Sequence, residues 1–444
     1  MALLVSLAVF LSGVIACLIL GIPLWVALAL GLVCFLLAGL RLGFRAGVLI
    51  KMAWEGAKTS FVVLRFLLVI GCLTALWRAS GTISFFVYYG MKMITPPMFV
   101  IYAFLIPLVL SYILGTSFGV TGTAGVMLMV LARSGGVDPL IVAGAVMSGA
   151  YFGDRCSPAS SSAFLTSEVS GADHLRYQKM MLKTGILPTV AALAVYVLLS
   201  LKNPLSEIDS TVVTALKSGF DLSWYIALPA IILVILPWLK ISAFCALAAS
   251  GAAAFTLAVL FQKQSFLHML AACILGYNST SAQLGSLLNG GGVLSMLGVM
   301  AVVLLSCSYS GIFNGTDMLK PVQEKLGRTS VKIGLFPAQV LTALVTSGVF
   351  CNQSLGIILS AQMFYKVYEE RGRSKDELAA DIGSSIITIA GLIPWSIAST
   401  VPLAMLGVGS GALLYSTFLY AVPICYFFTK RLWFKTPRGV PDGK

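Results

Sequence analysis

The chain has 444 residues, of which 59% are apolar and only 10% are charged, and its formal net charge is +13. A soluble domain carries about 25% charged residues, so this composition excludes an ordinary soluble protein. The basic residues stand in short groups between apolar segments, which argues against nucleic acid as a partner and predicts an all-α, polytopic integral membrane protein in a lipid bilayer.

Apolar segments follow one another along the whole chain, and the stretches 1–40, 264–316 and 382–429 contain no Asp, Glu, Lys or Arg. Each stretch exceeds the ~20 residues needed to cross a bilayer. In chain order we predict apolar spans at 3–20, 22–40, 61–77, 83–94, 98–114, 118–132, 139–153, 185–200, 222–239, 242–261, 266–277, 293–312, 333–349, 353–368, 382–393 and 403–429. No basic residue precedes Arg41, so we expect the first segments to stay as a hairpin rather than act as a cleaved signal peptide.

Several interruptions between the spans are rich in Gly, Ser, Thr, Asn or Pro: 116–123, 153–162, 277–292, 350–356 and 394–400. Irregular backbone inside a membrane survives only where protein or a water-filled cavity covers it. We therefore predict broken helices and re-entrant hairpins at these places.

Basic residues gather in 41–58, 176–183, 320–332 and 430–438. Cytoplasmic loops carry an excess of Lys and Arg, so we place these four segments inside the cell. Both chain termini are then predicted to be cytoplasmic, with an even number of crossings between them.

An internal repeat relates the two halves of the sequence. Adding 236 to Pro158 gives Pro394, and adding 236 to Ser160 gives Ser396; an offset of 237 relates Ser117 to Ser354, and one of 234 relates residues 80–82 to 314–316. Charged loops of one half correspond to uncharged loops of the other, which predicts two inverted-topology repeats. We expect them at 1–201 and 222–444, joined by an extracytoplasmic connector at 202–221.

Inverted repeats with broken helices are typical of secondary transporters, whose sites lie near the midplane at the repeat interface. Carboxylate, hydroxyl and carbonyl oxygens suit Na+, and burial of a carboxylate favours its protonated form, so that a proton competes with Na+. The candidate cation- and proton-binding residues are Asp154, Ser157, Thr116, Ser117, Thr121, Asn352, Gln353 and Ser354.

Five further residues are open to a solute-binding or a structural role: Arg155, Ser160, Ser161, Ser396 and Asp381. The serines after Pro158 also suit helix caps, and the helix dipole favours an acid such as Asp381 in a first turn. The nine cysteines are scattered, and the two histidines, His174 and His268, lie far apart without an HExxH motif. We expect no enzyme, no cofactor and no metal site other than one for Na+ at Asp154.

Four motifs in one order carry a family resemblance: GTSFGVTGT (115–123), GAYFGDRCSP (149–158), NQSLGIILSAQMF (352–364) and GLIPWS (391–396). They resemble the NhaC-type Na+/H+ antiporter family of the ion-transporter superfamily, over about residues 21–426. The resemblance implies a carrier of the bacterial inner membrane. It also implies that Asp154 is the ion and proton carboxylate, that Ser157 and Pro158 shape its loop, and that Asn352 and Gln353 belong to the second-half site.

The chain departs from the family pattern at several positions. Many members have Asp and Asn where this chain has Ser161 and Phe164, Asn where it has Ser396, and a Glu-Asp pair where it has Ala380 and Asp381. The leading hypothesis is Na+/H+ exchange by alternating access. The alternative is Na+- or H+-coupled transport of a small organic acid or amino acid, with Arg155 as carboxylate partner; a channel and a homodimeric assembly also remain open.

Overall fold

The computed structural model describes residues 2–93, 96–204, 216–239, 241–279, 285, 288–316, 318 and 333–434. These residues form helices and no strand, apart from one isolated antiparallel bridge between Tyr277 and Gly290. Four of the described helices are long and apolar enough to cross a membrane: Leu24–Arg41, Ala46–Ala79, His174–Lys202 and Val293–Thr316. The prediction of an all-α, polytopic membrane protein is confirmed.

The helices of the first half are α1 (Ala2–Leu20), α2 (Leu24–Arg41), α3 (Ala46–Ala79), α4 (Thr82–Met93), the 3-10 turn η1 (Pro96–Met98), α5 (Phe99–Leu114), α6 (Ser117–Val120), the π-helical turn η2 (Thr121–Gly125), α7 (Val126–Ser134), α8 (Pro139–Cys156), α9 (Ser161–Ser170) and α10 (His174–Lys202). Those of the second half are η3 (Trp224–Ala227), α12 (Leu228–Trp238), α13 (Ala243–Leu260), α14 (Phe266–Leu275), α16 (Val293–Thr316), α18 (Leu335–Phe350), α19 (Gln353–Glu370), α20 (Lys375–Ala390), α21 (Ile397–Leu406), η4 (Ser410–Tyr415) and α22 (Thr417–Trp433).

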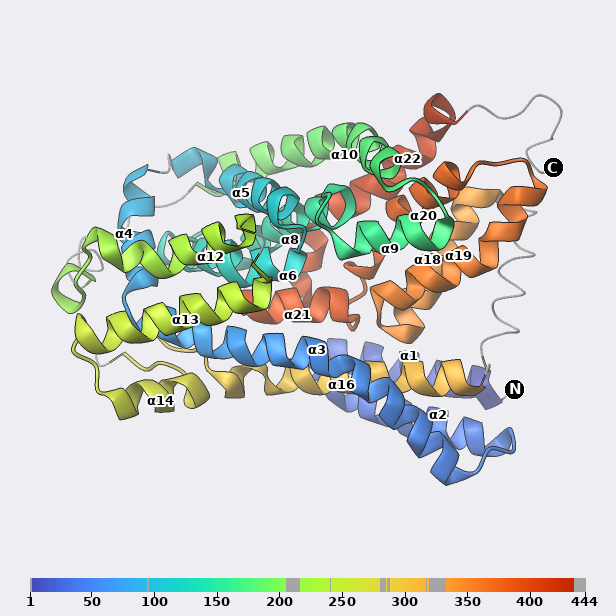
Figure 1. The fold of residues 1–444 in the computed structure, drawn as a ribbon, viewed down its shortest axis with the longest axis horizontal. Helices are drawn as coiled ribbons and strands as arrows, with labels where there is room; N and C mark the ends of the chain where they lie inside the picture. Colours follow the sequence, from blue (N-terminus) through green and yellow to red (C-terminus); the bar gives the residue numbers. More distant parts are fainter. Residues whose placement is uncertain are drawn as a thin grey trace.

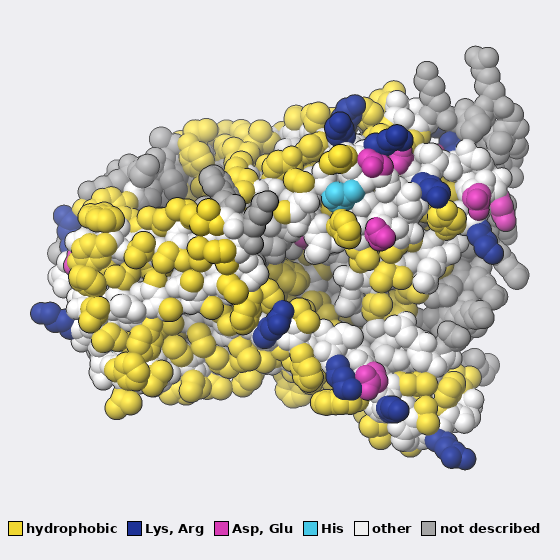
Figure 2. Space-filling view, in the orientation of Figure 1, with side chains coloured by type: hydrophobic (Ala, Val, Ile, Leu, Met, Phe, Trp, Pro, Cys, Tyr) yellow, Lys and Arg dark blue, Asp and Glu magenta, His cyan; other side chains and the backbone are white. Residues whose placement is uncertain are grey.

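Most helices lie along the long axis of the molecule, and the start of α1 and the end of α22 lie at the same end (Figure 1). Figure 2 shows that hydrophobic side chains cover most of the visible face. Acidic side chains and most basic ones gather toward the end that holds α9, α19 and α20. This separation of apolar and charged surface is what a membrane-embedded body with one charged end requires.

Three predicted element bounds are wrong. The span predicted at 61–77 is the C-terminal half of the 34-residue helix α3, which also includes most of the segment predicted as a basic loop. The span predicted at 185–200 belongs to α10, which begins at His174, and the one predicted at 382–393 belongs to α20, which begins at Lys375. In all three cases a helix continues beyond its apolar part, because charged side chains end the hydrophobic pattern without ending the helix.

The span predicted at 403–429 is also divided. Helix α21 ends at Leu406, and its C-cap Gly407 has the left-handed backbone (φ 67°) that glycine adopts readily. A 3-10 turn, η4, follows before α22 begins at Thr417. The predicted basic segment 320–332 lies outside the described residues, and so does most of the connector 202–221.

Element bounds recur at a separation of 236 residues. Both ends of α5 and α18 are 236 apart, and so are both ends of α9 and α21. The residues that end α5 and α18, Gly115 and Cys351, share a left-handed backbone with φ of 66° and 56°. The offset of 237 predicted for the block at 114–127 is therefore one too large, since these bounds pair Ser117 with Gln353. The recurrence supports the predicted internal repeat.

The corresponding helices α3 and α16 pack against each other in opposite directions (Figure 1). Gly56 near the start of α3 lies against Gly311 near the end of α16, and Gly71 farther along α3 lies against Gly292, before the start of α16. A Cβ at Gly56 would lie 2.3 Å from the carbonyl oxygen of Cys307, so the close approach depends on glycine. Antiparallel packing of equivalent helices is what an inverted repeat requires.

Two hairpins bring the chain breaks together inside the protein. Helices α5 and α8 run in the same direction, with Gly153 of α8 against Ser111 of α5, and the chain between them returns through α6, η2 and α7. Gly115 at the tip of this hairpin lies against Ala159 in the break between α8 and α9. In the second half the amide of Ile397 donates a 2.9 Å hydrogen bond to the carbonyl of Cys351, which joins the tip of α18–α19 to the break before α21.

Candidate functional site

Asp154 lies in the last turn of α8, one turn before that helix ends at Cys156. Its side chain is only 8% exposed, and Ser117 Oγ donates a 3.2 Å hydrogen bond to Asp154 Oδ2. Ser160 Oγ donates a 2.7 Å hydrogen bond to the main-chain carbonyl of Asp154, which holds the break of α8–α9 close to the carboxylate. A buried carboxylate with one hydroxyl donor and no ion pair among the described residues is available for a cation or a proton.

A cavity of about 200 Å³ adjoins this carboxylate, and we call it the aspartate cavity. It is lined by Thr59, Val63, Gly115, Thr116, Ser117, Phe118, Asp154, Ser161, Ser162, Cys307, Asn352, Gln353, Ser354, Ile397 and Ala398. Of the eight predicted cation- and proton-binding residues, six line it together: Asp154, Thr116, Ser117, Asn352, Gln353 and Ser354. Both halves of the chain therefore contribute polar groups to one cavity.

Four helices begin at this cavity. Their N-cap residues are Thr116, Ser160, Asn352 and Ser396, and each side chain accepts a hydrogen bond from an amide in the first turn of its helix. A helix N-terminus carries a partial positive charge and free N–H groups, so four of them stabilise negative charge. The cavity thus favours an ionised Asp154, or a bound anion, and the carboxylate in turn offers a cation its charge.

Four of the other predicted residues act in the local backbone structure. Thr121 Oγ1 donates to the carbonyl of Ser117 at 2.9 Å, in the π-helical turn η2. Ser157 Oγ accepts from the amide of Ala159 at 3.1 Å. These two residues, together with the N-caps Ser160 and Ser396, lie outside the cavity lining, whereas Ser161 is part of it.

Arg155 points away from the aspartate cavity. It is fully buried, and its guanidinium donates to the carbonyls of Gly383 and Met181 at 3.1 and 2.9 Å and to the hydroxyls of Thr184 and Ser384 at 2.7 and 3.0 Å. These contacts join α8 to α10 and α20. With its donors used by the protein, Arg155 is placed as a structural residue rather than as a partner for a solute.

Asp381 lies in a buried ionic cluster on α20. Tyr426 Oη donates to Asp381 Oδ1 at 2.7 Å, and Tyr368 Oη and Lys430 Nζ donate to Oδ2. Lys430 Nζ also lies 2.8 Å from Glu377 Oε1. The cluster joins α19, α20 and α22 and lies outside the lining of the aspartate cavity, so Asp381 has a structural role.

Three lining residues were not predicted as site residues: Thr59 of α3, Cys307 of α16 and Ser162 of α9. Gln353 Nε2 donates a 3.0 Å hydrogen bond to Ser162 Oγ, a direct contact between the two halves at the cavity. Ser162 belongs to the run of serines that follows Pro158, so its position could have been anticipated. Thr59 could not, because its segment has the charge pattern of a cytoplasmic loop.

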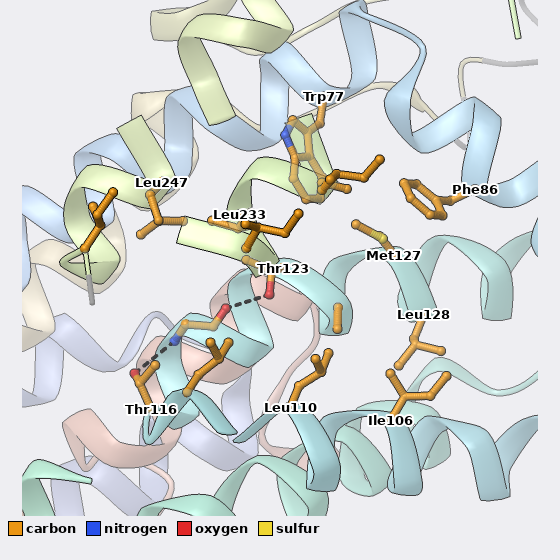
Figure 3. A pocket seen from close by; sticks show the side chains of 18 of the residues that line it. Trp77, Phe86, Ile106, Leu110, Thr116, Thr123, Met127, Leu128, Leu233 and Leu247 are labelled. Atoms are coloured by element: carbon orange, nitrogen blue, oxygen red, sulfur yellow. Dashed lines mark hydrogen bonds between the residues drawn. The ribbon is translucent and has the colours of Figure 1, made fainter. Parts of the chain in front are cut away.

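A larger cavity of about 640 Å³ lies on the other side of Thr116. Figure 3 shows its wall of Trp77, Phe86, Leu110, Leu128 and other apolar side chains. Its polar groups include the hydroxyls of Thr116 and Thr123, which bond to the amide and the carbonyl of Gly119 (Figure 3). Such an apolar surface suits lipid chains and offers a cation no charged ligand, so we assign ion binding to the aspartate cavity.

The sequence profile of the Na+/H+ antiporter family matches residues 1–197 and 165–429, which is nearly the whole chain. The chain belongs to this family. The predicted membership is therefore confirmed, and an antiporter family of multi-pass membrane proteins agrees with the helical fold.

Three relatives show the range of this antiporter family. The malate-2H+/Na+-lactate antiporter of Bacillus subtilis (strain 168) is 27% identical over 99% of this chain and 97% of its own length. The Na+/H+ antiporter NhaC of Alkalihalophilus pseudofirmus is 27% identical over 80% and 78%, and the arginine/ornithine antiporter ArcD of Halobacterium salinarum is 27% identical over 82% and 79%.

Proposed function

We propose that this antiporter exchanges Na+ for H+ and that both ions compete for the carboxylate of Asp154. The observation that carries the proposal is the position of Asp154, the one acidic residue among the described residues that line the aspartate cavity. Oxygen atoms of Ser117, Asn352 and Gln353 line the same cavity and can complete the coordination of a small hard cation.

Competition at a single group couples the two ions. When Asp154 is ionised, Na+ balances its charge; when a proton binds, the carboxyl is neutral and Na+ loses its main ligand. Only these two neutral occupancies avoid an uncompensated charge during movement through the membrane. Exchange then follows if the cavity opens alternately to the two sides.

The geometry supports an arrangement that opens toward the charged end of the molecule. Ser161 and Ser354 are exposed at the cavity and lie on α9 and α19, in the part of the protein where charged side chains gather. Toward the other end, Thr121 Oγ1 contacts Met405 Sδ at 3.6 Å. We propose that the charged end faces the cytoplasm of a bacterial cell.

The direct test is to generate an acid interior in everted vesicles and to add Na+, Li+ or K+ while following the pH gradient. Na+ is expected to dissipate the gradient through the wild-type protein. Asp154→Asn is expected to abolish the effect, because an amide binds no exchangeable proton in this range. If no cation dissipates the gradient, or if Asp154→Asn exchanges as well as wild type, the proposal fails.

Asp173→Asn is the matched control. Asp173 is an exposed N-cap of α10 that accepts a 2.9 Å hydrogen bond from the amide of Arg176, and asparagine caps a helix about equally well. This variant removes one carboxylate outside the cavity by the same substitution. Its exchange activity is expected to equal that of wild type.

A second candidate is coupled transport of a small organic acid. The four helix N-termini at the aspartate cavity favour it, because their N–H groups can bind a carboxylate beside the coupling ion. The malate-2H+/Na+-lactate antiporter among the relatives points in the same direction. In loaded proteoliposomes, exchange of labelled malate for lactate that requires Na+ would favour this candidate, whereas Na+/H+ exchange undisturbed by either acid would exclude it.

A further inference from the structure

A second polar cavity, of about 290 Å³, lies near the ends of α3, α7 and α21 and the chain before α16. We call it the arginine cavity, because Arg78 and Arg133 both line it. Its other polar side chains are Thr74, Asn289 and Ser295, and none of the described lining residues is acidic. Two guanidinium groups thus face one space without a carboxylate beside them.

Arg78 is the more unusual of the two. It is only 9% exposed, and among the described residues its one side-chain hydrogen bond runs from Nη1 to the carbonyl of Thr74, at 2.8 Å. Its Nε–H is buried without a hydrogen-bond partner. A buried charge is costly unless it is paired, so an arginine that lines a cavity in this state calls for an anion.

Arg133 approaches the same cavity from α7. Its Nη2 donates to the carbonyls of Leu406 and Gly407 at 3.1 and 2.8 Å, which caps the C-terminus of α21. This contact uses one nitrogen of the guanidinium and fixes the group at the rim of the cavity. Arg133 is also exposed, as are Asn289 and Gly290, so solutes can reach the cavity at this point.

We propose that the arginine cavity binds a small organic acid through its carboxylate, held by Arg78 and Arg133. The planar guanidinium matches the two oxygens of a carboxylate and forms paired hydrogen bonds with them. The volume corresponds to about ten water molecules at ~30 Å³ each, far more than a chloride ion needs. Apolar side chains, Val126, Met129 and Met405 among them, can cover the short carbon chain of such an acid.

The arginine cavity lies close to the aspartate cavity. Met405 lines the arginine cavity and its Sδ lies 3.6 Å from Thr121 Oγ1, while Thr121 bonds to the carbonyl of Ser117, which lines the aspartate cavity. One layer of side chains thus separates an anion-binding space from the carboxylate of Asp154. A bound organic acid would sit where the route from this end of the protein meets the ion site.

The test is isothermal titration calorimetry on the full-length protein in nanodiscs, with sodium malate, sodium lactate and sodium chloride as probes at constant total Na+. At least one of the two acids is expected to bind saturably, with no comparable binding of chloride. Arg78→Gln and Arg133→Gln are expected to weaken this binding by about tenfold or more, the effect of losing a charge-assisted hydrogen bond. Asp154→Asn is expected to keep it, so this proposal and Na+/H+ exchange can fail independently.

Arg65→Gln is the matched control, because Arg65 also belongs to α3 but is exposed and lies over the rings of Phe66 and Phe244, outside the cavity lining. It should bind like wild type. Arg78→Lys, which keeps the charge but loses the planar fork, replaces Arg78→Gln if the latter does not fold, and should also bind more weakly. Wild-type affinity in the Arg78 and Arg133 variants, no saturable binding of either acid, or equal binding of chloride would overturn the proposal.

Discussion

At the scale of single residues, Asp154 combines the properties that a shared ion and proton site requires. Its side chain is 8% exposed, it borders a cavity lined by oxygen ligands, and its hydrogen-bond donor Ser117 comes from another helix. A fully solvated carboxylate would bind Na+ weakly, and one held in an ion pair would not release its partner. Asp154 avoids both conditions.

Ser117→Ala tests the oxygen ligands around this carboxylate. The change removes the hydroxyl that donates to Asp154 at 3.2 Å and that can turn its oxygen toward Na+. The apparent KM for Na+ is expected to rise by about threefold to tenfold, the effect of losing one hydrogen bond of ~1 kcal/mol, with a smaller change in kcat. The measurement is the initial rate of Na+-dependent proton movement at several Na+ concentrations.

Ser157→Ala provides the contrast. Ser157 caps the break after α8 without lining the aspartate cavity, so its loss should lower thermal stability and leave the KM for Na+ unchanged. A KM for Na+ that rises in Ser157→Ala and stays constant in Ser117→Ala would contradict the assignment of ligands.

The sequence could identify Asp154 because a carboxylate is rare in such an apolar chain, and its hydroxyl and amide partners because they sit in the interruptions. It could not separate Asp154 from Arg155. Consecutive residues of a helix point about 100° apart, so the two side chains cannot both face one cavity. Which of them does so is decided by how α8 packs, and that depends on contacts with α10 and α20.

At the scale of elements, the chain breaks bring the site together. Each hairpin tip adopts a left-handed residue, Gly115 or Cys351, and is followed by an N-cap, Thr116 or Asn352. These breaks expose helix N-termini inside the protein, where water and the cavity side chains can satisfy them. The same breaks supply the polar residues of the aspartate cavity.

The ionic cluster on α20 gives a prediction for stability. Lys430 is paired with both Asp381 and Glu377, and removing it leaves two buried carboxylates with reduced compensation. Lys430→Met is expected to lower the free energy of unfolding by about 3–5 kcal/mol. Chemical denaturation of the purified variant in detergent measures the change.

Lys58→Met is the control for this prediction. Lys58 pairs with Glu55 at 2.7 Å, but both side chains are about half exposed, and such pairs contribute ~0–1 kcal/mol. Equal losses of stability in the two lysine variants would show that the buried cluster has no special weight.

The sequence could locate most helices but misplaced the ends that leave the membrane. Helix α3 has 34 residues and would extend about 51 Å at 1.5 Å per residue, well beyond a ~30 Å hydrocarbon core. Its first turns carry exposed Lys51 and Lys58, which indicate solvent but do not indicate a loop. Hydropathy reports the solvent around a segment, and helix formation depends on propensity and packing as well.

At the scale of the whole molecule, the two halves share bounds and differ in chemistry. The position 236 residues after Asp154 is Ala390, and the positions corresponding to Arg78 and Arg133 are Asn314 and Glu369. A repeated backbone therefore carries the acid and the two cavity arginines in the first half only. This asymmetry lets the related halves move as similar bodies while one carboxylate holds the exchanged ion.

The inverted arrangement predicts the sidedness of single cysteines in a variant without the nine natural ones. An impermeant maleimide should label Lys51→Cys and Lys375→Cys only in inside-out vesicles, and Lys263→Cys only in right-side-out vesicles. Lys51 and Lys375 belong to different halves, so labelling them from opposite sides would contradict the proposed topology.

The most direct test of shared binding at Asp154 is calorimetry of Na+ binding in buffers with different ionisation enthalpies. If Na+ displaces a proton from Asp154, the wild-type protein should release protons on binding Na+, and its apparent affinity should fall as the pH falls. Asp154→Asn should show neither proton release nor Na+ binding in the same range. Na+ binding to Asp154→Asn with wild-type affinity, or with undiminished proton release, would contradict the account.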